Sequence, residues 1–198
     1  KGNSGAKSAS YFLITVTDNG CGMAHDAIPN LFGRVLSGSK YGVRQTRGKF
    51  GLGAKMALIW SKKSTGHPIH IQTAHRTDNE SIPDKISHSI LDIDIYKNQP
   101  RILEHTLSPN TTNFVGTTVR VLIAGSWTTY RARIVQYLQQ LAIITPYAAL
   151  GLNYSETSGK RDFELSYDRR SEQMPPTPVT VKHHPASVNN IIIQELVQ

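Results

Sequence analysis

The sequence predicts an α+β sandwich in which helices pack on one face of a mixed β-sheet. Short runs of β-branched and aromatic residues recur along the chain, and one long segment carries apolar residues at helical spacing. A second segment, rich in helix formers, follows a glycine-rich loop, and polar or Pro-containing stretches separate these runs. The chain has 198 residues. We expect one domain at 1–172, then a connector and the start of a following helical domain at 173–198.

Composition excludes several classes of protein. The single cysteine, Cys21, excludes a disulfide framework. No run of about 18 apolar residues is present, so no membrane span is expected. The formal net charge is +8, and residues 27–77 hold nine basic residues and no Asp or Glu. Such a stretch favours phosphate groups of a nucleotide or of DNA, although a basic face kept for solubility is the alternative.

The first elements follow from local signals. Residues 1–10 are small and polar and predict a loop, and the aromatic and β-branched segment Tyr11–Thr17 predicts a buried strand. The strand ends at a turn-forming Asp-Asn-Gly. We expect a short helix after Asp26, with Asp26 as its cap. The long connection at 33–53 is typical of a functional loop.

Two helices and a series of strands complete the expected order. Ala54–Lys63 has good helix formers, and Trp127–Ile144 repeats apolar residues at helical spacing until Pro146. The Pro-rich segment at 174–178 predicts an extended connector. The remaining expected elements are strands at Ile69–Ala74, Ser89–Tyr96, Arg101–Thr106, Val115–Ile123, Leu150–Tyr154 and Phe163–Tyr167, a polar loop at Ser108–Asn113, and a helix within Ala186–Val197.

The first chemistry-bearing motif is Asp18-Asn19-Gly20-Cys21-Gly22-Met23, directly after the first strand. An Asp at a strand end can point its carboxylate into a pocket, while glycines let the backbone pass close to a planar ligand. The carboxylate can accept a hydrogen bond from an exocyclic amine such as that of adenine. A hairpin turn at Asn-Gly is the alternative. An EF-hand loop is excluded because Pro29 stands where the bidentate Glu is required.

The second motif runs from Arg47 to Lys55 (RGKFGLGAK) and leads directly into a helix. Its glycines let backbone N–H groups converge on phosphate oxygens, the helix N-terminus adds its dipole, and the lysines can neutralise charge. The G-x-x-G-x-G order reverses the dinucleotide fingerprint and no strand precedes it, which excludes a Rossmann site. A flexible linker is the alternative, and Phe50 and Leu52 between the glycines suit it poorly.

The third motif, at 33–40 (GRVLSGSK), resembles a P-loop but has Lys and Ser transposed and no strand before it, so a P-loop is excluded. Ser39 and Lys40 remain candidates for closing over phosphates. The histidine pairs at 67/70 and 183/184 have no Cys or carboxylate cluster to complete a metal site, so we expect none.

The order of these motifs resembles the GHKL ATPase superfamily. D-x-G-x-G is followed by a long lid loop, by G-x-x-G-x-G leading into a helix, and by a strand bearing Gly116-Thr117. Within the superfamily, FGRVLSGSKYGVRQTRGKFGLGAKMALIWS is similar to the B subunits of DNA topoisomerase VI. TTYRARIVQYLQQLAIITPYA and MPPTPVTVKHHPASV extend the similarity, which covers nearly the whole chain after Tyr11.

The resemblance implies a Bergerat-type ATP-binding fold and a nucleotide site. Asp18 would accept a hydrogen bond from the adenine amine, Gly22 would let the ring approach, and Thr117 would support the base and its bridging water. The lid and the second motif would hold the phosphates. The residues that the resemblance assigns to nucleotide binding are Asp18, Gly20, Gly22, Met23, Ser39, Lys40, Gly48, Lys49, Phe50, Gly51, Leu52, Gly53, Ala54, Lys55 and Thr117.

The resemblance also implies a function. An ATP-binding module of a type IIB topoisomerase B subunit would use ATP and Mg²⁺ to drive passage of one DNA duplex through another, and so relaxation and decatenation. Its partners would be double-stranded DNA, a DNA-cleaving A subunit and a second B subunit, joined in an ATP-dependent dimer. The location would be the nucleus in a eukaryote and otherwise the cytoplasm.

Two alternatives stay open beside this function. A protein kinase or chaperone ATPase of the same superfamily fits the lid-to-helix segment less well. A non-catalytic relative that serves as a scaffold for a DNA-cleaving protein in meiotic recombination need not keep nucleotide chemistry. The presence of Asp18, Gly22, Gly48, Gly51 and Gly53 favours the ATPase.

The chain departs from the family at its beginning. It starts at Lys1 without a Met, so we expect it to be a fragment that is incomplete at the N-terminus. In the family, a helix bearing the catalytic Glu and the Mg²⁺-binding Asn precedes the first motif, and residues 1–10 contain no Glu. A lysine from a later domain of the family also lies beyond the chain. We therefore assign no catalytic or metal-binding residue here, and expect weak nucleotide binding with very little hydrolysis.

Overall fold

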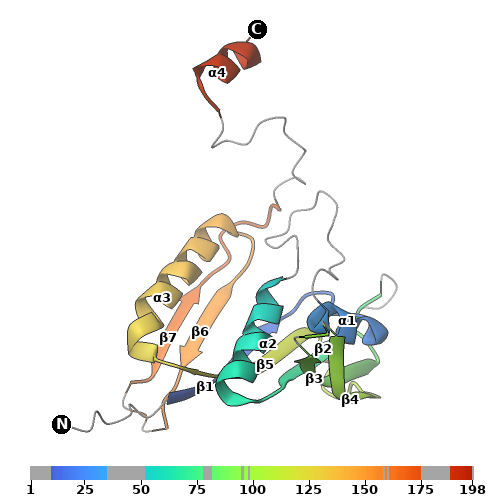
Figure 1. Cartoon of the computed structure of the whole chain (residues 1–198). Coiled ribbons are helices and arrows are strands. Elements are labelled where there is room, and N and C mark those ends of the chain that lie inside the picture. The colour runs from blue at the N-terminus through green and yellow to red at the C-terminus, as the bar shows by residue number, and fades with distance from the viewer. Residues whose placement is uncertain are drawn as a thin grey trace, which may run out of the picture.

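The computed structural model describes residues 10–34, 52–77, 82–94, 96–97, 99–157, 159, 161–174 and 188–197. Within these residues the chain forms a five-stranded sheet, a separate two-stranded sheet and several helices (Figure 1). In chain order the elements are β1 (Ser10–Asp18), the 3₁₀ helix η1 (His25–Ala27), α1 (Ile28–Gly33), α2 (Leu52–Thr65), β2 (Ile69–Ala74), β3 (Lys85–Asp94), β4 (Gln99–Pro109), β5 (Gly116–Gly125), α3 (Trp127–Ile144), β6 (Leu150–Tyr154), β7 (Phe163–Tyr167) and α4 (Asn190–Val197).

The larger sheet has the strand order β1-β5-β2-β3-β4. The expectation of a mixed sheet is wrong, because every strand pair in the described part of the chain is antiparallel. The reason lies in the position of β5. The crossover through α1 and α2 leaves β1 and β2 parallel to each other, as the alternation of strands and helices suggested, but β5 lies between them and runs the opposite way. The α+β class is confirmed.

Helices α1 and α2 cover one face of this sheet, as expected (Figure 1). Apolar side chains from both helices meet those of the strands there, and their burial is the main stabilising term of the fold. The buried core consists of Ile28, Phe32, Leu58, Ile69, Ile71, Leu91, Ile93 and Val121.

The first strand forms as expected, but the expectation that it is buried is wrong. Almost every residue of β1 is exposed, including Tyr11, Leu13 and Val16. The reason is that β1 lies at the edge of the sheet, while α1 and α2 pack mainly on β3, β4 and β5. Apolar composition favours a strand but does not decide whether a helix covers it.

The start of the first helical segment differs from the expectation. Asp26 caps no helix, because η1 begins at His25 after Ala24, which makes no side-chain capping bond. Asp26 lies inside η1 instead. The α-helix proper begins at Ile28, with Pro29 in its first turn, where the fixed φ of proline suits a helix and its missing N–H is no loss.

The β3–β4 hairpin is longer than expected. The alternation of apolar residues predicted strands at 89–96 and 101–106, whereas pairing extends from Lys85 opposite Pro109 to Asp94 opposite Gln99. The loop expected from Ser108 therefore begins only at Asn110. The polar residues Lys85, Ser87, His88 and Ser108 hid these ends, because cross-strand hydrogen bonding does not require apolar side chains.

Helix α3 is confirmed with the expected bounds, and Ser126 caps it by accepting a hydrogen bond from the Thr129 N–H. The helix lies beside the β6–β7 hairpin (Figure 1). The Trp127 ring stacks on Tyr154, with centroids 3.9 Å apart, and the Arg131 guanidinium lies 4.6 Å from the centroid of Phe163. No helix in the described ranges is both long and apolar enough to cross a membrane.

Candidate functional site

Asp18 and Thr117 lie directly opposite each other where β1 ends and β5 begins. The Asp18 side chain is exposed, and its Oδ1 atom accepts a hydrogen bond of 2.9 Å from the Gly20 N–H. This local turn fixes the carboxylate and leaves its second oxygen without a partner among the described residues. Thr117, by contrast, is buried, with 7% of its surface exposed. The pair therefore presents one fixed carboxylate beside a hydroxyl at the end of the sheet.

A buried threonine on β2 orients the Thr117 hydroxyl. Thr73 Oγ1 donates a hydrogen bond to the Gly116 carbonyl oxygen (3.1 Å) and accepts one from the Met23 N–H (3.0 Å). It also lies 3.0 Å from Thr117 Oγ1. Because the single Thr73 proton is directed to Gly116, the proton in this last bond comes from Thr117. With its proton used in this bond, Thr117 Oγ1 can only accept further hydrogen bonds.

Two glycines allow the backbone to pack closely around this site. Gly22 has φ +70°, and a Cβ there would lie 2.1 Å from the Ala74 carbonyl oxygen. Gly116 has φ +108°, and a Cβ there would lie 1.9 Å from the Asp18 carbonyl oxygen. Both positions need glycine for the fold itself, whatever ligand approaches.

The loop after β1 is tied to β2 and to the core. The Arg76 N–H donates a 2.8 Å hydrogen bond to the Cys21 carbonyl oxygen, and the Met23 side chain packs against the hydrophobic core. Met23 was assigned to nucleotide binding by the resemblance, and the structure gives its side chain a packing role. Gly20, by its N–H, holds the Asp18 carboxylate.

The N-terminal end of α2 points toward the same end of the sheet. Near the C-terminal end of the helix, the Ser61 and Thr65 hydroxyls donate to the Leu122 carbonyl oxygen, late in β5. The nine residues from Ser61 back to Leu52 span about 14 Å of helix, and the five from Leu122 back to Thr117 span about 16 Å of strand. The helix therefore begins close to the level of Thr117.

The first turn of α2 holds the predicted residues Leu52, Gly53, Ala54 and Lys55. Gly53 is exposed, and a Cβ there would meet no atom of the described residues within 4 Å. Lys55 is fully buried, and this burial lowers the pKa of its ammonium group below the ordinary value. A phosphate beside this group would offset the cost of burying the charge.

The structure thus brings Asp18, Gly20, Gly22, Met23 and Thr117 together, and directs Leu52–Lys55 toward them. Thr73 was missed in the sequence, although its place in the alternating segment IHIQTA marks it as inward-facing. Lying outside the described residues are Ser39, Lys40, Gly48, Lys49, Phe50 and Gly51.

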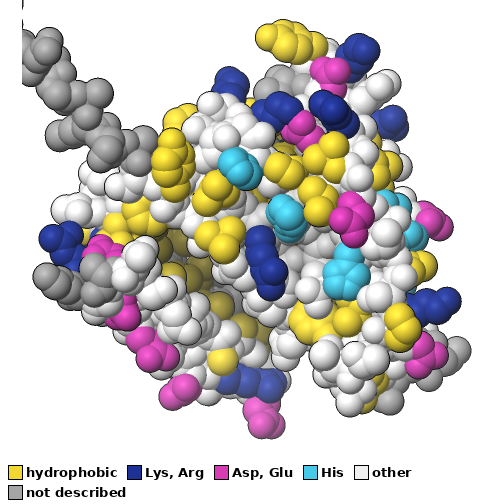
Figure 2. All heavy atoms as spheres, turned by 90° about the horizontal axis from the view of Figure 1, so that it is seen from below, with side chains coloured by type: hydrophobic (Ala, Val, Ile, Leu, Met, Phe, Trp, Pro, Cys, Tyr) yellow, Lys and Arg dark blue, Asp and Glu magenta, His cyan; other side chains and the backbone are white. Residues whose placement is uncertain are grey.

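The opposite face of the sheet carries a separate feature. A cavity of about 180 Å³ is lined by polar side chains, among them His70, His88, Glu104 and Arg120. The view from below in Figure 2 shows histidine and basic side chains close together on one face of the molecule. Among the described residues, none that is predicted to bind nucleotide lines this cavity.

Sequence comparison identifies similar proteins over almost the whole chain. The chain is 48% identical over 189 residues to the B subunit of DNA topoisomerase 6 from Arabidopsis thaliana, which covers 96% of this chain and 28% of that protein. It is 48% identical over 193 residues to the protein of the same name from Oryza sativa subsp. japonica, which covers 98% of this chain and 27% of that protein. It is 38% identical over 191 residues to the B subunit of the type 2 DNA topoisomerase 6 from Saccharolobus islandicus, which covers 96% of this chain and 34% of that protein.

The chain therefore spans about a third or less of the length of these relatives. No protein-family model matches it. The two plant proteins are more similar to it than the archaeal one.

Proposed function

We propose that the chain is the ATP-binding part of a DNA topoisomerase 6 B subunit, because it is homologous to a segment of these subunits. The homology supports a place in a type IIB topoisomerase. The proposal that this segment binds ATP rests on the site at the end of the sheet, and above all on the Asp18–Thr117 pair.

The pair suits the exocyclic amine of adenine. The Asp18 oxygen that has no partner among the described residues and the Thr117 hydroxyl oxygen both accept hydrogen bonds, so together they select a ligand edge that donates. The amine of adenine donates, either directly or through a water, whereas guanine presents a carbonyl oxygen at the same position of its ring. Asp18 is charged, which strengthens its hydrogen bond.

The start of α2 suits the phosphates. Its first backbone N–H groups have no partners within the helix and face the same end of the sheet as Asp18. No described residue fills the space beside Gly53, so an anion can approach the backbone there, and the buried Lys55 ammonium adds positive charge. ATP would supply the free energy of phosphate transfer, while these residues bind and orient it. Mg²⁺ would travel with the phosphates, and no residue of the chain is assigned to it.

ATP binding by this segment would serve the function that the relatives' name indicates. We place it in a B subunit that dimerises when ATP binds, acts with a DNA-cleaving A subunit and couples hydrolysis to passage of a DNA duplex. In a eukaryotic cell this work takes place in the nucleus. The formal charge of +8 supports contact with the DNA backbone.

The test measures binding of a non-hydrolysable ATP analogue with Mg²⁺ by calorimetry. Asp18→Asn should weaken binding at least about tenfold, since a charged hydrogen bond contributes about 1.5–3 kcal/mol. Asp94→Asn is the matched control, because Asp94 also accepts backbone N–H groups in a local turn but lies at the end of β3. A GTP analogue should bind more weakly than the ATP analogue.

Equal losses in the Asp18 and Asp94 variants would contradict the adenine pocket. A wild-type chain that is folded by circular dichroism and binds no analogue would contradict ATP binding, and would favour the scaffold function.

A further inference from the structure

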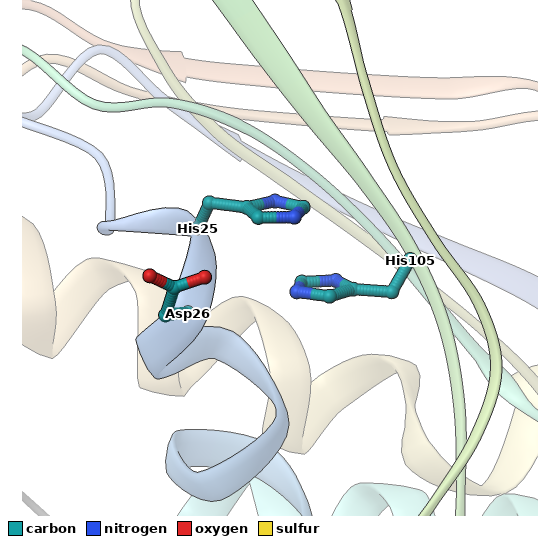
Figure 3. A group of neighbouring side chains, drawn as sticks. All are labelled: His25, Asp26 and His105. Carbon is teal, nitrogen blue, oxygen red and sulfur yellow. The ribbon is translucent and has the colours of Figure 1, made fainter.

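Two histidines and an aspartate from distant parts of the sequence meet at one edge of the helix-covered face (Figure 3). His25 and Asp26 belong to η1, and His105 lies on β4. One potential ligand atom from each residue lies within 4.8 Å of the others. The two imidazole rings stack with centroids 3.7 Å apart and an angle of 1° between their planes. Asp26 and His105 are 79 residues apart in the sequence, which explains why the sequence alone does not reveal the cluster.

Two buried serines on β3 hold the rings by one nitrogen each. His25 Nδ1 lies 3.1 Å from Ser87 Oγ, and His105 Nδ1 lies 2.8 Å from Ser89 Oγ. When each Nδ1 donates its proton to the serine, each Nε2 keeps its lone pair. Neither Nε2 has a hydrogen-bond partner within the described residues. A hydrogen bond from the second ring nitrogen is the usual support of a metal-binding histidine.

The Asp26 side chain is exposed and makes no hydrogen bond or ion pair within the described part of the chain. One of its carboxylate oxygens lies within 4.8 Å of a ring nitrogen of each histidine, close enough to share a positively charged ligand with them.

We propose that His25, Asp26 and His105 bind a divalent transition-metal ion such as Zn²⁺. Two imidazole nitrogens and one carboxylate oxygen suit Zn²⁺, Co²⁺ or Ni²⁺, with water completing the coordination. Mg²⁺ prefers a set of oxygens only, so this site is distinct in kind from any Mg²⁺ that accompanies ATP.

Metal binding requires a local change. Parallel rings direct their lone pairs along parallel lines, whereas bonds of about 2.0–2.2 Å to one ion need lone pairs that converge. One ring must therefore turn out of the stack, and the exposed Asp26 must rotate toward it. The bound ion would link η1, which follows the loop of Gly20 and Gly22, to the edge strand β4. Both the loop and the edge would become more stable.

The experiment titrates ZnCl₂ into the full chain by calorimetry without nucleotide, and repeats the titration with Co²⁺ to record its visible absorption. We expect one dominant site and a higher melting temperature with Zn²⁺. His25→Asn, His105→Asn and Asp26→Asn should each weaken binding at least tenfold and remove the increase in melting temperature. Because Asp26 is exposed, its substitution should not disturb folding. Circular dichroism without metal checks that each variant is folded.

Three controls separate this site from other ligands of the chain. Cys21→Ser, His70→Asn and the double variant His183→Asn/His184→Asn should bind Zn²⁺ like the wild type. Wild-type affinity in all three cluster variants would overturn the proposal. So would loss of binding in a control variant with the cluster intact.

Discussion

Thr73 and Thr117 join β2 and β5 through a buried hydrogen bond of 3.0 Å between their hydroxyl oxygens. Each hydroxyl has one proton. Because Thr73 donates its proton to the Gly116 carbonyl oxygen, Thr117 must be the donor in the bond between the two hydroxyls. The Met23 N–H donates a hydrogen bond to the same Thr73 hydroxyl oxygen. The Thr73 side chain, which is not expected to touch the nucleotide, thus holds the loop after β1. It also makes the Thr117 hydroxyl an acceptor for further hydrogen bonds.

Thr73→Val should destabilise the fold and weaken analogue binding together. Valine has the same shape but leaves the Met23 N–H and the Thr117 hydroxyl without their partner in a buried site, at about 1–3 kcal/mol each. We expect a loss of about 3 kcal/mol in the free energy of unfolding, measured by urea denaturation. Thr15→Val, on the exposed part of β1, should change it by less than about 0.5 kcal/mol. Similar values for the two variants would show that Thr73 does not organise the site.

Gly116→Ala should be among the most destabilising substitutions in the chain. Positive φ costs an alanine about 1–2 kcal/mol, and its Cβ would approach the Asp18 carbonyl oxygen to 1.9 Å. We expect a loss of at least about 3 kcal/mol in thermal or urea unfolding. Gly151→Ala is the control, because a Cβ there meets no atom within 4 Å in the part of the chain that the structure describes. An unchanged melting temperature for Gly116→Ala would mean that β1 and β5 can separate at this point without cost.

Local patterns predicted much of this structure. The strand at 69–74, the helix at 127–144 and the hairpin strands at 150–154 and 163–167 have the expected bounds, because their apolar spacing continues to both ends. Asp18, Gly22 and Thr117 were also selected from the sequence, by motif order, and the fold places them together.

Features that depend on contacts between distant segments could not be predicted. The insertion of β5 between β1 and β2 is a matter of topology, since the spacing of side chains within a strand does not identify its neighbours. Thr73 reads as one inward-facing residue among several until Met23 and Gly116 are placed beside it. His25 and His105 come together only through the packing of η1 on the sheet.

Lys55 should make stability depend on pH. Burial lowers the folded-state pKa below the ordinary value of 10.5, so the unfolded chain binds more protons between the two values. The free energy of unfolding contributed by this group therefore rises as pH increases through that window, and is constant above 10.5. Urea denaturation across the alkaline range, compared between wild type and Lys55→Met, isolates the contribution as a difference in slope. Lys63→Met, at an exposed position of the same helix, should keep the wild-type slope. Equal slopes in wild type and Lys55→Met would contradict this origin.

Gly53→Ala separates the needs of the fold from those of a ligand. A Cβ at this position, in the first turn of α2, meets no described residue within 4 Å, so alanine should stabilise the helix by about 0.5 kcal/mol. The same methyl group would stand where phosphate oxygens approach the backbone N–H groups. We therefore expect a slightly higher melting temperature together with analogue binding weakened about tenfold, or about 1.4 kcal/mol. Higher stability with unchanged affinity would place the phosphates away from the start of α2, while the Asp18 result would still decide the adenine pocket.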